Sequence, residues 1–321
     1  MSAVSTEFKC IEVSYCPICQ LNNSSFLIKK YDDRFGQPDY FEYYYCVNCN
    51  IAFLKNKIAE EYLPELYKKY YGKDKQLSAK SSKLKLVLEK IGLDKIIFNR
   101  LAGNKFLLNN VRKNSNVLEI GSGYSSELKK IIFLKKLDWT GLEVDEDSVA
   151  RLKRDDPKAI HGTIKLNNIQ DKFDYIISSQ SLEHQHDINY FFENSKKFIK
   201  NGGKIIFTTP NFDSRYRKKY GGRWINWHTP YHITILSKRG IENLCERHGF
   251  VVSKFFTYTP TSWYTLQKKF EIPKLGELNT KFNFKFSLVG QLFSSIFLRF
   301  YEFLDKTNGD CIYCEIKIKT Q

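Results

Sequence analysis

Two glycines mark a turn that could hold a nucleoside. Gly121 and Gly123 follow the apolar segment 116–120, which carries Glu119 near its end. Apolar residues before such a glycine pair are typical of a buried strand that turns tightly into a helix, here expected over 125–134. The turn lets a ligand approach the backbone, and the helix start offers unpaired N–H groups. Glycine pairs after strands are common, so cofactor binding and simple chain reversal both remain open.

A second acidic residue favours cofactor binding. Glu143 ends the next expected strand, 137–144, about twenty residues after the glycines. At this spacing a carboxylate can accept hydrogen bonds from both ribose hydroxyls of a nucleoside. A merely solvated carboxylate is the alternative, and the position of Glu143 relative to the glycine turn makes ribose binding the better interpretation.

Four motifs, in this order, resemble those of class I S-adenosylmethionine-dependent methyltransferases. They are Glu119 to Gly123, Gly141 to Glu143, Phe173 to His184 and Asn201 to Asn211. The resemblance covers 110–256, with Ser125 at the third glycine position of the family loop. It implies an α/β fold with a Rossmann-like, seven-stranded sheet and helices on both faces, and S-adenosylmethionine as cofactor. The cofactor contacts that it implies are Glu119, Gly121, Ser122, Gly123, Glu143, Val144, Gly162, Thr163 and Ser179.

Three histidines are candidates for a catalytic base. His184 follows the fourth expected strand, 173–179, and His228 and His232 follow the fifth. The carboxyl ends of parallel strands are where a doubly wound sheet binds its ligand, and an imidazole is a suitable base for a sugar hydroxyl. His184 is alternatively a cofactor contact or part of the first turn of a helix expected over 187–198.

The segment 213–232, expected to be irregular, combines arginine, tryptophan and histidine. Arginine can bind phosphate through two hydrogen bonds, and flat aromatic faces can stack on sugars or bases. Core packing of the aromatic rings is the alternative. The pattern over 209–250 resembles methyltransferases of bacterial glycan and sugar biosynthesis, many of which carry an N-terminal zinc-ribbon-like segment. The predicted substrate-binding residues are Arg215, Arg223, Trp224, Trp227 and Tyr231.

Two Cys-x-x-Cys pairs lie near the start of the chain. Cys16 and Cys19 form one pair, Cys46 and Cys49 form the other, and strand-like aromatic residues lie between them. Four thiolates in two such pairs can surround a zinc ion tetrahedrally, and a closed shell of four sulfurs is a structural site. A redox pair or two disulfides fit a cytoplasmic chain less well. We predict a small zinc-ribbon-like module with structural Zn²⁺.

The last part of the chain should complete the sheet. The segments 251–258 and 311–319 are expected to form an antiparallel hairpin, and Cys311 and Cys314 should pack on opposite faces of its second strand. The intervening insertion is densely apolar, with basic flanks. Through 281–305 it is expected to cap the active site, to form a homodimer contact or to lie at a membrane surface.

The 321 residues are enough for one large or two modest domains. We predict a zinc-binding module at 1–55, a helical linker at 56–115, the cofactor-binding core at 116–260, the insertion at 261–308 and the final core strand at 309–321. Within the linker, a short helix is expected over 59–72, and Tyr70 and Tyr71 either approach the cofactor or pack between domains. A third strand is expected within 157–163. Neither an apolar stretch of about eighteen residues nor an export signal is evident. We therefore expect a cytoplasmic protein, with attachment to the cytoplasmic membrane face as a hypothesis.

The resemblance implies methyl transfer to a sugar or glycan, with a hydroxyl oxygen as the expected acceptor and with a sugar, nucleotide-sugar or lipid-linked glycan as substrate. Two alternatives remain. One is a zinc-containing RNA base methyltransferase, which the net charge of +16 would suit. The charge is dispersed, however, and an Asn-Pro-Pro-Tyr motif is absent, so a nucleic-acid partner is the weaker prediction. The other is a binding protein without turnover.

Overall fold

The computed structural model describes residues 7–71, 107–108, 110–123, 126–154, 158–164, 169, 171–279 and 288–319. The amphipathic helices expected over 78–111 lie almost wholly outside these residues.

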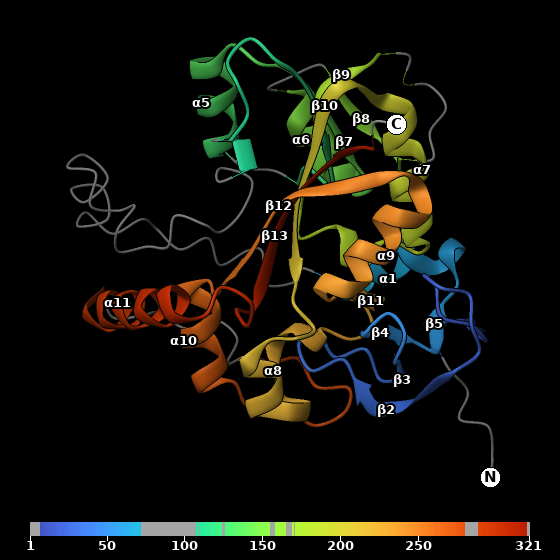
Figure 1. Ribbon diagram of the computed structural model, residues 1–321. Coiled ribbons are helices and arrows are strands. Elements are labelled where there is room, and N and C mark those ends of the chain that lie inside the picture. Colours follow the sequence, from blue (N-terminus) through green and yellow to red (C-terminus); the bar gives the residue numbers. More distant parts are fainter. Residues whose placement is uncertain are drawn as a thin grey trace.

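A seven-stranded sheet forms the centre of the molecule, in the order β12-β13-β10-β9-β6-β7-β8 (Figure 1). Strands β6 to β10 are mutually parallel, and β13 runs antiparallel to both β10 and β12. The chain builds outward from β6 to β8 and then crosses to β9, so the strand order reverses between β6 and β9, where doubly wound sheets bind ligands. The predicted fold class and terminal hairpin are confirmed. The strands are β6 (Asn116–Ile120), β7 (Asp138–Glu143), β8 (Ala159–His161), β9 (Phe173–Ser179), β10 (Ile199–Pro210), β12 (Phe250–Tyr258) and β13 (Cys311–Ile318).

Helices cover both faces of this sheet. One apolar core joins alternate strand residues such as Ile176 and Phe207 to α7 and α9, and a second joins residues such as Ile177 and Ile206 to α5 and α6. This division follows from the alternation of side chains along each strand, and Figure 1 shows the two helix pairs on opposite sides. The helices are α5 (Ser126–Lys135), α6 (Glu146–Lys153), α7 (Ile188–Phe198) and α9 (Lys238–His248).

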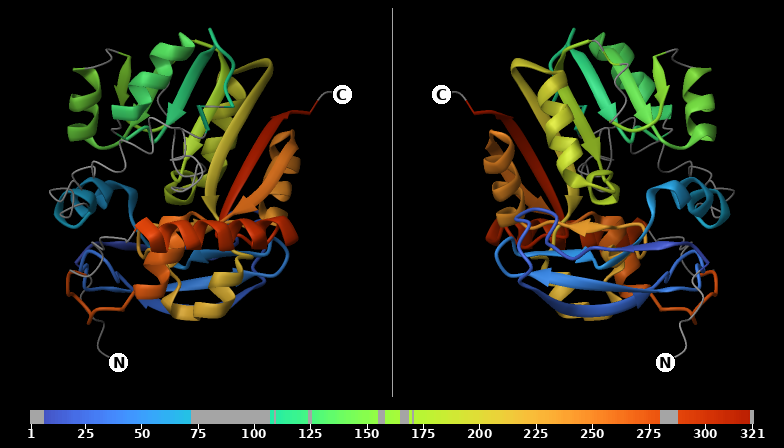
Figure 2. Two further views of the ribbon diagram at one scale, coloured as in Figure 1. Left: turned by 90° about the vertical axis from the view of Figure 1, so that its left-hand side faces the viewer. Right: turned by 90° about the vertical axis from the view of Figure 1, so that its right-hand side faces the viewer.

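The N-terminal strands form a second sheet that also includes one short strand from the core part of the chain. Its order is β11-β4-β3-β2, and β11 pairs antiparallel with β4. Gly240 of α9 packs directly on this sheet, since a Cβ there would lie 2.5 Å from Ile51. Figure 2 shows the carboxyl end of β10 facing the N-terminal strands. The strands are β2 (Ser24–Tyr31), β3 (Tyr40–Cys46), β4 (Ile51–Leu54) and β11 (Thr234–Ile235), beside the small pair β1 (Cys10–Glu12) and β5 (Asn56–Ile58).

Shorter helices connect these layers. Pro64 lies in the first turn of α1, where its missing N–H is tolerated, so it starts this helix rather than breaking it. The segment expected to be irregular begins instead with α8, because the Ser214 hydroxyl accepts hydrogen bonds from the N–H groups of Tyr216 and Arg217. The elements are η1 (Glu60–Tyr62), α1 (Leu63–Lys69), η3 (Leu182–His184), α8 (Arg215–Tyr220), η4 (Gly221–Arg223) and η5 (Ile225–Trp227).

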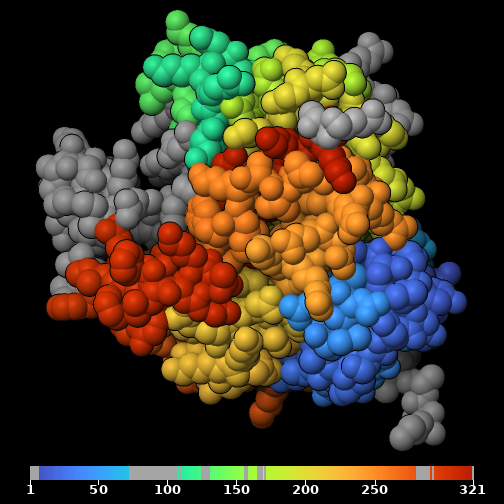
Figure 3. All heavy atoms as spheres, viewed as in Figure 1, coloured from blue at the N-terminus to red at the C-terminus, as the bar shows by residue number. Residues whose placement is uncertain are grey.

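The insertion contains α10 (Thr261–Lys269) and α11 (Leu288–Leu304). Figure 3 shows α11, in red, on the molecular surface. Several of its apolar side chains are exposed, including Phe293, Phe300 and Phe303, which is 80% exposed. None of the helices in the described part of the chain has the length and hydropathy needed to cross a membrane.

Candidate active site

The glycine turn lies directly against the end of β9. Gly121 and Gly123 have positive φ angles of +67° and +53°. A Cβ at Gly121 would lie 2.6 Å from the Cβ of Ser181, and the Gly121 N–H donates to the Leu142 carbonyl at 2.8 Å, which holds the turn to β7. The turn is therefore bare backbone at the point of strand reversal. This geometry fits the close approach of a cofactor.

Glu143 lies at the rim of this turn. Its Oε2 accepts the N–H of Gly123 at 2.7 Å, and its Oε1 accepts those of Val144 and Asp145 at 2.8 and 3.0 Å. The backbone thus fixes the carboxylate between β7 and the glycine turn. A carboxylate offers about four lone-pair directions, and three are occupied, so about one remains for a ribose hydroxyl. The predicted contact of Glu143 with both ribose hydroxyls remains a prediction.

Glu119 lies deeper than the rim. It is only 1% exposed, and its Oε2 accepts the indole N–H of Trp139 at 2.8 Å. The indole ring occupies the space beside Gly141, where a Cβ would clash with the ring. In this structure Glu119 therefore positions Trp139 across β6 and β7. Its predicted contact with the cofactor remains a prediction.

The other predicted cofactor residues surround the same edge. The N–H of Gly162 donates to the Glu143 carbonyl at 2.8 Å, which brings the end of β8 beside β7. The Ser179 hydroxyl lies 3.5 Å from that of Thr208, between the ends of β9 and β10. Ser122 is buried within the turn. Val144 is half exposed and Thr163 is partly buried at this edge.

Beside the glycine turn, Glu183, His184, His228 and His232 form a group that we call the histidine cluster. Glu183 is fully buried and follows Ser181 by two residues. Its Oε2 accepts the hydroxyl hydrogen of Thr209 at 2.9 Å, whereas its Oε1 has no hydrogen-bond partner among the described residues. Burial raises the pKa of Glu183 to about 8.

The hydrogen bonds of the cluster define its tautomers. The Nδ1 of His232 lies 2.8 Å from the carbonyl of Asn226, which can only accept, so Nδ1 carries the hydrogen and Nε2 the lone pair. The Nδ1 of His228 lies 3.3 Å from that Nε2, so it donates to it. The Nε2 of His228 is then an unprotonated nitrogen, and it is buried with no partner among the described residues. It is therefore available to accept a proton.

Aromatic side chains cover the histidine cluster. The Tyr67 hydroxyl lies 3.4 Å from the Nδ1 of His184. The ring of Tyr71 stacks on that of His228 with their centroids 5.8 Å apart, and the ring of Tyr231 lies 5.0 Å from the same histidine. Two tyrosines of the N-terminal part and one from the core therefore enclose the cluster.

The same tyrosines connect the histidine cluster with the cofactor edge. Burial raises the pKa of Tyr67, and the charges of Glu143 and Glu183 raise it further. The charges of both carboxylates also raise the pKa of Tyr71. Tyr67 and Tyr71 thus lie close enough to Glu143, the predicted ribose-binding residue, and to Glu183 of the histidine cluster for both charges to affect their pKa values. Of the predicted pair, Tyr71 reaches this site, whereas Tyr70 bonds to Glu7.

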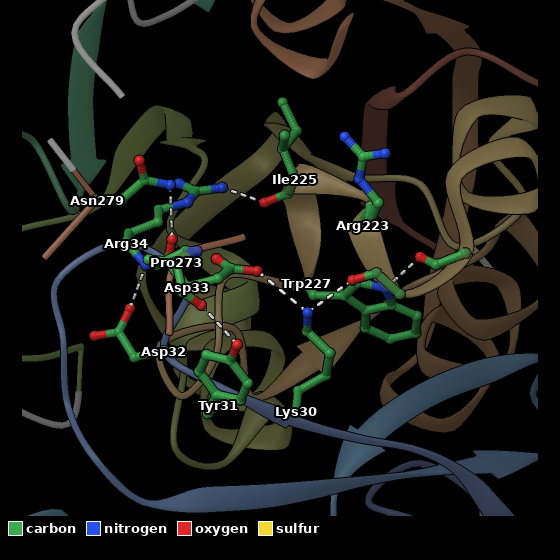
Figure 4. A network of polar contacts seen from close by, with 12 residues as sticks. Lys30, Tyr31, Asp32, Asp33, Arg34, Arg223, Ile225, Trp227, Pro273 and Asn279 are labelled. Carbon is green, nitrogen blue, oxygen red and sulfur yellow. Dashed lines mark hydrogen bonds and ion pairs between the residues drawn. The ribbon is translucent and has the colours of Figure 1, made fainter. Parts of the chain in front are cut away.

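A network of polar contacts joins the charged residues 30–34 to Ile225 and Asn279 (Figure 4). The Arg34 guanidinium donates to the Ile225 carbonyl, and the Arg34 N–H donates to Asp32 at 2.9 Å. Lys30 pairs with Asp33 at 3.2 Å. Burial lowers the pKa of each histidine of the cluster, that of His184 to about 4, and the charge of Arg34 lowers each of them further. The histidines are therefore neutral at physiological pH.

The predicted substrate residues separate in the structure. Tyr231 lies in the aromatic cover, but Trp224 and Trp227 are buried in the core. The Trp224 indole donates to Asp310 at 2.8 Å, and that of Trp227 donates to the Gly221 carbonyl at 2.9 Å. Core packing therefore describes both tryptophans as they lie here.

Both predicted arginines contact the insertion. Arg215 lies over the ring of Tyr301 at 5.1 Å, and the exposed Arg223 donates to the Phe270 carbonyl at 2.6 Å. Neither contact is with a residue of the histidine cluster. Their substrate-binding role remains a prediction.

The four cysteines of the N-terminal pairs converge, as predicted. Their sulfur atoms all lie within 4.8 Å of one another, with the Sγ atoms of Cys19 and Cys46 3.7 Å apart. All are free thiols, and the Asn243 amide and the Ile18 N–H point at the sulfurs of Cys49 and Cys16. The group can hold one metal ion. Three of its members, Cys16, Cys46 and Cys49, are fully buried in the same core as α7 and α9.

The sequence predictions did not include several residues of this site. Glu183 was recognisable, because it follows a strand end and precedes a candidate histidine. Tyr67 and Arg34 gave no signal, since nothing in their surroundings distinguishes them from packing or surface residues. Their proximity to the cluster depends on how the N-terminal strands dock on the core.

Comparison with known proteins supports the fold. Residues 95–254 match the model of a family described as a methyltransferase domain. A search of curated proteins finds no match. Among solved structures, one similar chain belongs to a complex between the Haloferax volcanii Trm112 methyltransferase activator and a methyltransferase, with 14% identity, 76% of this chain and 100% of that chain covered, and a TM-score of 0.46.

Two further structures are similar at the same level. An S-adenosylmethionine-dependent methyltransferase from Archaeoglobus fulgidus has 19% identity, 74% and 100% coverage of the two chains and a TM-score of 0.45. The cyclopropane synthase MmaA2 from Mycobacterium tuberculosis has 13% identity, 74% and 87% coverage and a TM-score of 0.45. The conclusion rests on the family match and on the seven-stranded sheet with its glycine turn. The chain is an S-adenosylmethionine-dependent methyltransferase.

Proposed function

We propose that the enzyme methylates a hydroxyl group of a sugar or glycan. The observation that carries this proposal is the histidine cluster, in which His228 keeps an unprotonated imidazole nitrogen and stacks against the ring of Tyr71. Glu183 and His184 of this cluster follow closely after Ser181, which lies against Gly121 of the glycine turn. The rings of Tyr71, Tyr231 and Phe35 lie together there, with Phe35 5.5 Å from Tyr231. Flat apolar faces combined with a few polar groups suit a sugar ring. The resemblance of segment 209–250 to glycan-pathway enzymes supports the same acceptor.

The chemistry requires alignment and removal of one proton. S-adenosylmethionine supplies a methyl group on a positively charged sulfur, which keeps the electron pair of the broken carbon–sulfur bond when the acceptor oxygen takes the methyl. Glu143 and the backbone of Gly121 and Gly123 would hold its nucleoside part. The Nε2 of His228 then takes the hydroxyl proton, and the hydrogen bond of His232 to Asn226 orients this pair of imidazoles. His184 and Tyr67 close the site on the other side.

Calorimetric titration with S-adenosylmethionine and S-adenosylhomocysteine tests cofactor binding. We expect micromolar binding that Gly121→Arg abolishes and Glu143→Ala weakens. Acceptor screening then compares nucleotide sugars, lipid-linked glycans and RNA, with His248→Gln as a control because His248 contacts Asn189 on α7. Methylation of RNA alone would replace the sugar proposal, and cofactor binding without turnover on any acceptor would favour a binding protein.

We infer that the cysteine group holds a structural zinc ion. Four sulfurs on a zinc ion at about 2.3 Å lie about 3.8 Å apart, close to the 3.7 Å between Cys19 and Cys46. The Ile18 N–H and the Asn243 amide, which are directed at the sulfurs of Cys16 and Cys49, suit thiolates bound to a metal ion. We expect one zinc equivalent in the purified protein. Its absence from elemental analysis would contradict the inference.

We also infer a peripheral membrane contact through α11. Its exposed phenylalanines form an apolar surface that a lipid interface would cover, and a homodimer contact is the competing use. We expect Phe300→Asp and Phe303→Asp to reduce co-sedimentation with anionic vesicles. A dimer that dissociates in these variants without any vesicle binding by the unaltered chain would support the competing use.

A further inference from the structure

The Oε1 atom of Glu183 is a buried carboxylate oxygen without a hydrogen-bond partner among the described residues. Glu183 has 0% exposure, and Thr209 engages only its Oε2. Its Oε1 faces the Nε2 of His232 at 3.9 Å, a distance too long for a hydrogen bond. A buried acceptor without a partner is costly, so this oxygen either carries a proton or meets a group that the protein does not itself provide.

His232 is arranged in the manner of a metal ligand. Its Nδ1–H donates to the Asn226 carbonyl at 2.8 Å, which fixes the ring and leaves the Nε2 lone pair directed into the cluster. A backbone carbonyl that holds the distal N–H is the usual outer partner of a histidine bound to a metal. Among the described residues, this lone pair accepts one hydrogen bond, from His228, and its length of 3.3 Å is long.

His184, which is adjacent to Glu183 in the chain, supplies a second nitrogen and thus a third ligand. Its ring lies 4.7 Å from that of His232, and the ligand atoms of Glu183, His184 and His232 all lie within 4.8 Å of one another. We propose that these three side chains form a second metal site, which binds a divalent first-row transition ion. Two imidazoles and one carboxylate suit such an ion and leave coordination positions open.

The hydrogen bonds of the cluster suit this site. The Asn226 carbonyl holds the Nδ1 hydrogen of His232, which leaves the Nε2 lone pair for a metal ion. The positive charge of Arg34 is offset by Asp32 and Asp33, which lie beside it. A cation bound to the Nε2 of His232 would replace the long hydrogen bond from His228. His228 would still have one unprotonated ring nitrogen in either tautomer. An acceptor hydroxyl bound to the ion at an open position would lose its proton more readily.

The test uses metal binding, which requires neither methyl donor nor acceptor. Co²⁺ is titrated into the full-length, zinc-replete protein and its visible absorption is recorded. We expect one equivalent to bind with weak ligand-field bands and no sulfur charge-transfer band, because the four thiolates remain on zinc. Glu183→Gln and His232→Asn should each weaken binding at least tenfold. The Asn side chain retains a donor toward the Asn226 carbonyl but lacks the nitrogen that would hold the ion.

His161→Gln is the matched control, because it removes an exposed imidazole outside the cluster and should leave Co²⁺ affinity unchanged. Pulsed electron paramagnetic resonance of the Mn²⁺-loaded, unaltered protein needs no substitution and should show coupling to imidazole nitrogen. Absence of binding, absence of nitrogen coupling, or equal affinity in the folded variants would each overturn the proposal. S-adenosylmethionine calorimetry on the same preparations reports the proposed function separately.

Discussion

The absence of a Cβ atom at Gly121 allows the glycine turn to pack against the residues that follow β9. Its positive φ disfavours any other residue, and its missing Cβ allows the turn to lie against Ser181. Gly123 has the same backbone conformation, but a Cβ there would meet no described atom within 4 Å. Only the first glycine is therefore required by packing as well as by backbone geometry.

Replacing Gly121 by alanine should lower the free energy of unfolding more than the backbone strain alone explains. Positive φ costs about 1 kcal/mol for alanine, and the contact with Ser181 adds about 1–3 kcal/mol. Chemical denaturation measures the loss. Gly202→Ala is the matched control, because Gly202 has a φ of +77° and open space around it. Equal losses in both variants would contradict the packing argument.

His228→Gln should lower turnover by about 10²–10⁴-fold without changing cofactor affinity. Glutamine fills a similar volume but has no basic nitrogen. Single-turnover rates with an acceptor and calorimetry with S-adenosylhomocysteine measure the two quantities. His248→Gln changes a histidine that contacts Asn189 on α7, and it should retain the normal rate. A normal rate in His228→Gln would exclude this residue as the base.

At the scale of elements, the start of β13 holds α8 and the following turns in place. The carboxylate of Asp310 accepts hydrogen bonds from the Ser214 hydroxyl and the Trp224 indole. These contacts connect the final strand to the segment that leads to His228 and His232. The terminal hairpin therefore completes the sheet and also positions the histidine cluster.

Stability should depend on pH through Asp310. Burial raises its pKa to about 6 from 3.8, so between these values the folded state holds a proton that the unfolded state has lost. The free energy of unfolding therefore falls as pH rises through this window, by roughly 3 kcal/mol at 1.36 kcal/mol per pKa unit. In Asp310→Asn this contribution should be absent. The free energy of unfolding of the variant minus that of the unaltered protein should rise from pH 4 to 6 and stay constant above pH 7. A value of this difference that does not change with pH would contradict the assignment.

At the scale of the whole molecule, the N-terminal strands and the methyltransferase core are interdependent. Strand β11 of the core completes the N-terminal sheet, and Tyr67 and Tyr71 extend from the N-terminal part over the histidine cluster. The Tyr43 hydroxyl donates to the carbonyls of Trp227 and His232. The proposed zinc ion would therefore stabilise the active site as well as the strands that carry its ligands.

Cys16→Ser should release zinc, lower the melting temperature by several degrees and reduce turnover, because the N-terminal strands would no longer support the histidine cluster. Cys10→Ser is the control, since Cys10 lies outside the group of four and should leave zinc content unchanged. Elemental analysis, thermal unfolding and acceptor methylation measure the three effects. Full zinc retention in Cys16→Ser would show that the group of four does not hold the ion.

The sequence by itself determined the features that depend on local order. The apolar strand before Gly121, the spacing to Glu143 and the ordered motifs that follow predicted the doubly wound sheet, because each strand, turn and helix is encoded by neighbouring residues. The two cysteine pairs likewise indicated four converging sulfurs, since the ligand spacing of such a site is local within each pair.

Only the tertiary structure decided which polar residues meet. Trp224 and Trp227 were predicted to bind substrate, yet they lie in the core, where their indoles donate to the buried Asp310 and to the Gly221 carbonyl. Tyr67 and Glu183 belong to distant parts of the chain, and their association with the histidine cluster depends on docking the N-terminal sheet against the strand ends. Such contacts depend on long-range packing and hydrogen bonding, which leave no periodic pattern in the sequence.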